Sequence, residues 1–205
     1  MLINITDGFL AGMMVSIGGA VLLSCDNRYV GACMFTIALL VICYRGYSLY
    51  TGKIGFMAES HTKSDFSALG FGLLGNIIGT LGCGLALSYA FPNIHTKAAA
   101  MCDARLAQAF PVTLIRAVFC GILMYTAVVI YKENKSVLGV LFCVPVFILS
   151  GFEHSIADMF YLDAALRYSV RSVAFILTVI LGNSIGGLLV PILSKIKAVR
   201  ANGKN

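Results

Sequence analysis

The sequence predicts an all-α membrane protein with six transmembrane helices, arranged as two inverted three-helix repeats whose second and fifth helices are broken. Three observations lead to this prediction: the composition, two similar glycine-asparagine segments, and two polar interruptions of apolar runs. The chain has 205 residues, of which 59% are hydrophobic and 12% charged, with a mean hydropathy of +0.90. Soluble domains carry about 25% charged residues, so this composition indicates a protein that lies in a lipid bilayer.

Six apolar runs are candidate membrane spans, because a helix needs about 20 residues to cross a ~30 Å hydrocarbon core. They cover residues 8–24, 29–45, 66–90, 112–131, 137–152 and 170–193. These spans leave few residues for a second domain. Residues 1–205 are therefore predicted to form a single transmembrane domain that ends in a basic tail at 194–205.

An internal repeat is indicated by the segments GNIIGT (75–80) and GNSIGG (182–187), which lie 107 residues apart, each in the third span of its half. Each half holds an odd number of spans. The second copy, approximately 112–193, is therefore expected to enter the membrane in the opposite orientation to the first, approximately 8–90.

The second spans of the two halves are interrupted at equivalent places, by YRGYSLYTGK (44–53) and by GFEHSIAD (151–158), about 105 residues apart. Non-helical backbone at membrane depth is tolerated only where protein buries it or where it lines a water-filled cavity. Paired breaks therefore predict a substrate path between the repeats. Asn76 and Asn183 of the glycine-asparagine segments either bond to carbonyls freed by the breaks or line this path.

Of the three histidines, only His154 lies within a predicted span, whereas His61 and His95 are expected in loops. Its unperturbed pKa of about 6.5 lets an imidazole release and recover a proton near neutral pH. His154 is thus a candidate proton relay at the centre of the path. The alternative is a neutral core histidine that bonds to backbone.

Two acidic residues accompany this histidine in the second break. Glu153 is expected to accept N–H bonds from the broken backbone or to balance the charge of a protonated His154. Asp158 is expected to cap the half-helix that follows. Asp158 and His154 could share a helical face, but a third metal ligand is missing, so no metal or other cofactor is expected.

The net charge of +6 is concentrated in the C-terminal tail and in the loop after the fourth span. With both termini cytoplasmic, eight basic residues lie inside and five outside, which agrees with the positive-inside rule. The inside set is Lys53, Lys63, Lys132, Lys135, Lys195, Lys197, Arg200 and Lys204, and the outside set is Arg28, Lys97, Arg105, Arg167 and Arg171. A cytoplasmic anchor explains the basic tail, so no nucleic-acid partner is expected.

The chain resembles the formate/nitrite transporter family over nearly its whole length. SGFEHSIADMF (150–160) is similar to that family's signature around a central histidine, SLYTG (48–52) to its break in the second span, and the two glycine-asparagine segments to its own. The resemblance implies a homopentamer in a bacterial inner membrane, with one pore per protomer. It also implies transport, rather than enzymatic activity, of small monovalent weak-acid anions such as formate, nitrite or hydrosulfide, coupled to protons.

Site roles follow from the same resemblance. His154 takes the place of the central pore histidine and Thr51 faces it. The outer constriction is assigned to Leu39 and Phe147, and the inner constriction to Leu49 and Tyr50. Lys53 either attracts anions at the cytoplasmic mouth or snorkels to the membrane interface.

Three departures from the family pattern bear on substrate preference. Tyr50 stands where the family has Phe and adds a hydroxyl to the expected inner slit. Asp158 stands where the family has Asn. The family's lysine before the fourth span falls near Ala109, which leaves Lys97 or Arg105 as the nearest cation.

Three other functions are weighed against anion transport. A channel of aquaporin-like architecture for a small neutral solute also has six spans and an inverted repeat, but it requires paired Asn-Pro-Ala boxes, which the glycine-asparagine segments do not match. An intramembrane hydrolase requires a serine nucleophile on a helix next to the histidine, and Ser150 and Ser155 are too close to it in sequence. A purely structural membrane protein has no need of a central histidine.

Overall fold

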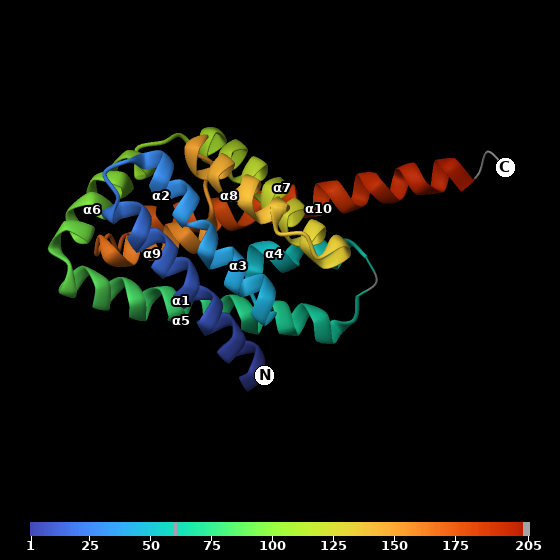
Figure 1. The fold of residues 1–205 in the computed structure, drawn as a ribbon, viewed down its shortest axis with the longest axis horizontal. Coiled ribbons are helices and arrows are strands. Elements are labelled where there is room, and N and C mark those ends of the chain that lie inside the picture. The colour runs from blue at the N-terminus through green and yellow to red at the C-terminus, as the bar shows by residue number, and fades with distance from the viewer. Residues whose placement is uncertain (60, 203–205) are drawn as a thin grey trace.

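The protein is an all-helical bundle in its computed structural model, which describes residues 1–59 and 61–202 (Figure 1). The first half contains α1 (Leu2–Ser24), α2 (Arg28–Met34), α3 (Thr36–Arg45), α4 (Tyr50–Lys53), the 3-10 turn η1 (Ile54–Ala58) and α5 (Lys63–Ala90). The helix α6 (Pro92–Leu106) connects it to the second half, which contains α7 (Phe110–Asn134), α8 (Leu138–Leu149), α9 (Ser155–Ala164) and α10 (Val170–Asn202).

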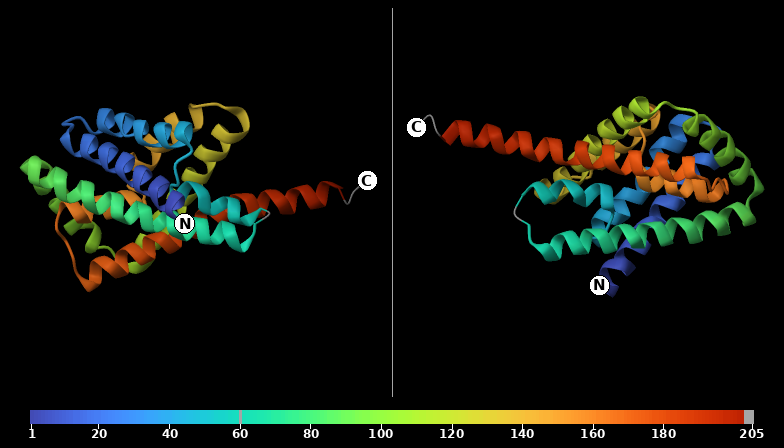
Figure 2. Two further views of the ribbon diagram at one scale, coloured as in Figure 1. Left: turned by 90° about the horizontal axis from the view of Figure 1, so that it is seen from below. Right: turned by 180° about the vertical axis from the view of Figure 1, so that it is seen from behind.

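Each half is built on one closely packed helix pair, α1 with α5 and α7 with α10 (Figure 2). Glycines at the crossings make this possible. A Cβ atom at Gly8 would collide with the backbone of Gly72, and one at Gly186 would collide with the backbone of Val118. Gly75 and Gly186 of the glycine-asparagine segments both lie at these crossings, where the absence of a side chain lets the helices pack closely.

Five helical stretches among the described residues are long and apolar enough to cross a membrane: Leu2–Ser24, Arg28–Arg45, Lys63–Ala90, Phe110–Asn134 and Val170–Lys197. The predicted fifth span differs, because α8 has only 12 residues and the chain then breaks before α9. The break covers residues 150–154, so the predicted interruption at 151–158 extends four residues too far.

The segment between the third and fourth spans is helical rather than a loop. The expectation that His95 lies in a loop is wrong: it belongs to α6, and its Nδ1 atom lies 2.9 Å from the carbonyl oxygen of Ala164 at the end of α9. His61 does lie outside the helices. The helix α10 continues beyond the predicted end of its span at residue 193, and residues 203–205 of the predicted basic tail lie outside the described residues.

The α3–α4 connection lies on the same side of the bundle as both terminal segments. Ser48 N–H donates to the carbonyl of Asp7 near the start of α1, at 3.2 Å. Lys195, near the end of α10, donates to the carbonyl of Ala58. The helix α6 lies on the opposite side (Figure 1).

Candidate pore and its central histidine

Three cavities follow one another through the bundle. The first, the α6 cavity, measures about 480 Å³, and the second, the chamber, about 10 Å³; both are lined by Phe147 and His154. The third, the α4 cavity, measures about 330 Å³ and shares Ile42 and Leu49 with the chamber. These shared lining residues place the chamber between the two larger cavities.

The chamber is narrow and almost entirely apolar. Its volume is about that of a single water-sized sphere. Its walls are Val15, Phe35, Ala38, Leu39, Ile42, Leu49, Met124, Val144, Phe147 and His154. Among these described residues, the imidazole of His154 is the one polar side chain. Any solute that passes must therefore lose nearly all of its hydration while facing a single titratable group.

The two helix breaks that form this region share one backbone design. A glycine with positive φ follows each interrupted helix: Gly46 (φ 71°) after α3, and Gly151 (φ 70°) after α8. Glycine adopts this left-handed conformation without the steric cost that other residues bear. The chain then becomes extended at Leu49 and at His154, which are the N-caps of α4 and α9. The first break thus places a leucine where the second places the imidazole.

Two buried asparagines hold these breaks in place. The side-chain oxygen of Asn76 accepts from Tyr50 N–H (3.0 Å), and its amide donates to the carbonyls of Ser48 and Gly8, both at 2.8 Å. Asn183 in α10 repeats this pattern in the second half.

The side-chain oxygen of Asn183 accepts from Ser155 N–H (2.9 Å), and its amide nitrogen donates to the carbonyls of Glu153 (2.9 Å) and Ala117 (2.8 Å). Of the two alternatives for Asn76 and Asn183, the structure shows the one in which they bond to backbone freed by the breaks.

His154 is fixed at both ring nitrogens. Its Nδ1 atom accepts from Ala157 N–H (3.1 Å) and thereby caps α9. Because a backbone N–H can only donate, Nδ1 carries no proton, and the neutral ring carries its proton on Nε2. That proton is donated to Thr51 Oγ1, which lies 2.8 Å from Nε2. With its oxygen accepting from the ring, Thr51 keeps its own hydroxyl proton free to donate.

Aromatic side chains support the imidazole from the α8 side. The ring of Phe147 stacks on His154 with centroids 5.6 Å apart, and Phe35 meets Phe147 edge-on at 6.0 Å. Phe35 was not among the predicted site residues. Its position four residues before Leu39 on the same helical face is the signal that could have identified it.

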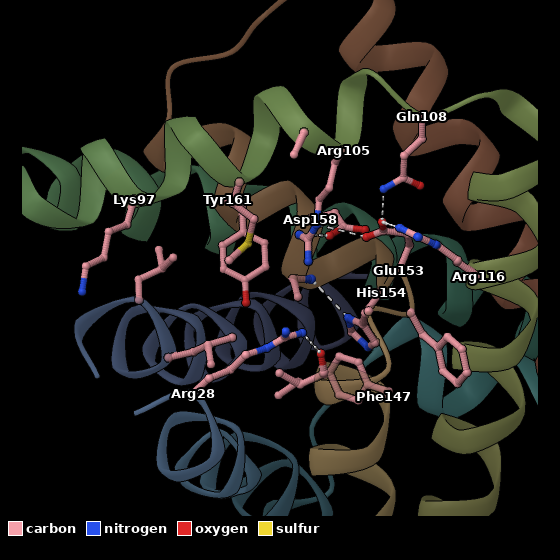
Figure 3. A pocket seen from close by; sticks show the side chains of 18 of the residues that line it. Arg28, Lys97, Arg105, Gln108, Arg116, Phe147, Glu153, His154, Asp158 and Tyr161 are labelled. Carbon is pink, nitrogen blue, oxygen red and sulfur yellow. Dashed lines mark hydrogen bonds and ion pairs between the residues drawn. The ribbon is translucent and has the colours of Figure 1, made fainter. Parts of the chain in front are cut away.

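A charge cluster lies beside the histidine (Figure 3). Arg105 of α6 contacts Glu153, with Nε 3.1 Å from Oε2, and also pairs with Asp158 through Nη1. The Glu153 carboxylate further accepts from Gln108 at 2.8 Å, and Arg116 lies 3.9 Å from it.

The expected role of Asp158 as the cap of α9 is therefore wrong, because His154 is the N-cap and Asp158 pairs with Arg105 instead. Glu153 likewise binds side chains rather than broken backbone.

Tyr50 does not lie where the expected inner constriction would place it. The hydroxyl of Ser184 donates its proton to the carbonyl oxygen of Ile180 (2.6 Å). In its contact with the Tyr50 hydroxyl (2.8 Å), Ser184 Oγ is therefore the acceptor and Tyr50 is the donor. This bond directs the Tyr50 hydroxyl toward α10, and Tyr50 is not among the residues that line the chamber or the α4 cavity. Lys53 does line the α4 cavity, together with Lys132.

The structure thus brings together Leu39, Leu49, Phe147 and His154 around one chamber, with Thr51 bonded to the imidazole. Sequence reasoning missed the role of Arg28, whose guanidinium donates to the carbonyls of Ile148 (3.1 Å) and Leu149 (3.3 Å) at the end of α8. The last carbonyls of a helix have no partner within the helix, but no pattern in the sequence indicates that Arg28 binds those at the end of α8.

Comparisons with known proteins agree with this architecture. The family model described as formate/nitrite transporter matches residues 2–196. An uncharacterized transporter of Bacillus subtilis (strain 168), YrhG, is 26% identical over 181 residues, which cover 78% of this chain and 68% of that protein. A formate-nitrite transporter of Plasmodium falciparum (isolate 3D7) is 25% identical over 229 residues, which cover 91% of this chain and 74% of the relative.

Two solved structures share the fold. An FNT family ion channel superimposes with a TM-score of 0.79 at 21% identity, over 95% of this chain and 88% of that one. A pentameric formate channel with formate bound gives the same TM-score of 0.79 at 19% identity, over 96% of each chain.

Proposed function

Because the chain belongs to the formate/nitrite transporter family, we propose that it is a membrane channel or transporter for small monovalent anions of weak acids: formate, nitrite or hydrosulfide. The observation that supports this proposal most directly is the chamber of about 10 Å³, apolar except for one imidazole that is bonded to Thr51. Transfer of a bare charge into such surroundings is very costly. A weak-acid anion avoids that cost by accepting a proton, whereas a strong-acid anion does not.

The α6 cavity supplies the approach to the chamber. Four cations and three carboxylates line it: Arg28, Lys97, Arg105 and Arg116, with Asp26, Glu153 and Asp158. The excess of positive charge favours entry of an anion. At the opposite end, Lys53 and Lys132 give the α4 cavity the same bias.

The proton is passed through His154 and Thr51. A proton from the water of the α6 cavity first binds Nδ1. The ring becomes an imidazolium, and Nδ1 can no longer accept from Ala157 N–H. The Nε2 proton then moves to Thr51 Oγ1 while the threonine hydroxyl proton moves to the anion, and the neutral acid crosses the chamber. The ring is then neutral, with its one proton on Nδ1. It returns to its starting form when Nε2 takes up a proton from water by way of Thr51 and Nδ1 releases its proton to water, after which the cap on α9 forms again. One anion and one proton thus travel together.

We place the protein in a bacterial inner membrane as a homopentamer with both termini cytoplasmic. The fold shared with a pentameric formate channel supports the assembly. The location of the α3–α4 connection and both terminal segments on one side, with the basic residues Lys53 and Lys132, supports the orientation.

Uptake into proteoliposomes tests the proposal. The intact protein is expected to take up labelled formate above the level of empty liposomes, with nitrite and hydrosulfide as competitors that rank the substrates. Water permeability, measured by osmotic shrinkage, should equal that of empty liposomes because the chamber is apolar. Fast water flux without formate uptake would overturn the proposal in favour of a neutral-solute channel.

A further inference from the structure

The cluster beside His154 contains two buried carboxyl groups but only one cation, itself partly buried, that contacts both of them. The side chains of Glu153 and Asp158 are 2% and 1% exposed, and both face the same guanidinium, that of Arg105, which is itself 20% exposed. The other cation, Arg116, is 43% exposed, lies 3.9 Å away and contacts only Glu153. A buried charge without a partner is strongly destabilising, so two full carboxylates are an unfavourable state of this cluster.

Two oxygens of the cluster identify what is missing. In the part of the chain that the structure describes, Oε2 of Glu153 and Oδ2 of Asp158 are buried without a hydrogen bond. Arg105 Nε lies near Oε2 but is not aligned to donate to it, and the guanidinium bridges both carboxyl groups. One proton held between the carboxyls would give both of these oxygens a hydrogen bond.

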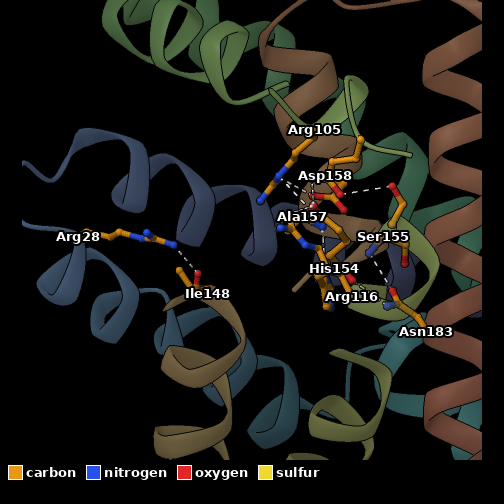
Figure 4. A network of polar contacts seen from close by, with 12 residues as sticks. Arg28, Arg105, Arg116, Ile148, His154, Ser155, Ala157, Asp158 and Asn183 are labelled. Carbon is orange, nitrogen blue, oxygen red and sulfur yellow. Dashed lines mark hydrogen bonds and ion pairs between the residues drawn. The ribbon is translucent and has the colours of Figure 1, made fainter. Parts of the chain in front are cut away.

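We propose that Glu153 and Asp158 share one proton under Arg105, and that this carboxyl pair is a second proton-binding site of the pore. Figure 4 shows Arg105 and Asp158 next to each other beside His154. The proton is bonded to Oδ2 of Asp158 and donated to Oε2 of Glu153. This assignment follows from the other contacts, because Glu153 is stabilised as an anion by Arg105, Arg116 and Gln108, whereas Asp158 has Arg105 alone.

The other ionisable groups around the pair leave this balance unchanged near neutral pH. They are Arg105 and Cys102 of α6, Arg116 and Cys120 of α7, Tyr161 of α9, and His154. Cysteine thiols and phenols are ordinarily neutral at that pH, and the neutral ring of His154 adds no charge.

The shared proton sets the charge of the α6 cavity. With the proton bound, its lining carries four cations and two anions; without it, four cations and three anions. Loss of the proton at high pH adds a buried negative charge beside the imidazole. We expect it to repel the incoming anion and lower flux. This consequence for flux rests on the proposed function, whereas the presence of the proton does not.

Infrared difference spectroscopy of the whole protein in liposomes tests the proton directly. The C=O stretch of a protonated carboxyl group absorbs at a higher frequency than the stretches of a carboxylate, and this frequency shifts when the sample is placed in D2O. We expect such a band at neutral pH in the intact protein and its loss in Asp158→Asn, whose amide can replace the donor. Asp163→Asn is the matched control, since it changes a buried aspartate of α9 that is not among the residues lining the α6 cavity, and the band should remain.

Glu153→Gln separates a shared proton from one that is bound to Asp158 alone. With one carboxylate left against Arg105, the charges balance, so the band should also disappear in this variant. Persistence of the band in Glu153→Gln, or its absence from the intact protein at neutral pH, would overturn the proposal.

Formate uptake measured in parallel tests the consequence. As alkaline pH removes the band, uptake should fall more steeply in the intact protein than in Asp158→Asn, because the part of the fall that comes from proton supply through His154 is common to both. Uptake that is unchanged while the band disappears would refute the effect on flux and leave the spectroscopic result standing. Absence of uptake at every pH would count against the proposed function instead.

Discussion

Replacement of Asn183 by alanine should destabilise the protein strongly, because its side chain completes the second helix break. The substitution removes the partners of Ser155 N–H and of the Glu153 carbonyl, both buried. The third partner, the carbonyl of Ala117, lies within α7 and keeps its helical hydrogen bond. Each orphaned group costs about 1–3 kcal/mol, so the expected loss is about 2–6 kcal/mol. This is a large fraction of a typical stability of about 5–15 kcal/mol.

Thermal unfolding of the purified protein in detergent, followed by circular dichroism, measures this loss. Asn76→Ala should be similarly destabilised, because it leaves Tyr50 N–H and the Ser48 carbonyl without partners. Asn93→Ala changes an exposed asparagine of α6 and provides the control. If Asn183→Ala unfolds at the same temperature as Asn93→Ala, the account of how the breaks are held is refuted.

Three further substitutions test the walls of the path. Thr51→Val removes the hydroxyl that links His154 to the anion and should lower formate uptake about tenfold or more, as loss of a positioned proton donor does; unchanged uptake would exclude the relay. Phe147→Ala opens the chamber, so chloride conductance in planar bilayers should rise while stability falls by about 3–5 kcal/mol; a bilayer that stays impermeable to chloride would show that this ring is not a barrier. Tyr50→Phe removes a bond to Ser184 outside the chamber and should cost about 0.5–1.5 kcal/mol in thermal unfolding without a change in uptake; altered uptake would place the hydroxyl in the path.

The helix breaks could be located from sequence because their determinants are local. Gly46 and Gly151 interrupt apolar runs at similar offsets in the two halves, and Asn76 and Asn183 recur in similar surroundings. A polar amide in an apolar helix must find partners, and the freed backbone of a nearby break supplies them. The structure shows one of the two alternatives that this reasoning left open, in which the amides bond to carbonyls freed by the breaks.

The charge cluster could not be located in the same way. Arg105 lies 53 residues before Asp158, in a helix that the hydropathy pattern does not reveal. Its pairing depends on how α6 packs against α9, which holds Asp158 in its first turn. Without that cation, Asp158 is naturally interpreted as a helix cap, and the error follows from the missing partner.

The Tyr50 hydroxyl illustrates a different limit. Its position in the chain indicates that it lies near the inner end of the path, but its direction depends on the rotation of the four-residue helix α4. A neighbouring hydroxyl on α10, that of Ser184, attracts it away from the path. No local pattern relates these two residues.

The pH dependence of formate uptake by the intact protein and by His154→Asn tests the central claim most directly. Asparagine is among the best helix N-caps, so the introduced amide can still accept from Ala157 N–H, and thermal unfolding should verify that the variant is folded. Measurements at about pH 5.5 and about pH 7.5 bracket the ordinary imidazole pKa of about 6.5. We predict that the intact protein takes up formate at both values, faster at the lower one, and that the variant retains only the uptake that follows the fraction of formic acid in solution. Identical rates and identical pH profiles in the two proteins would contradict the claim that His154 supplies the proton.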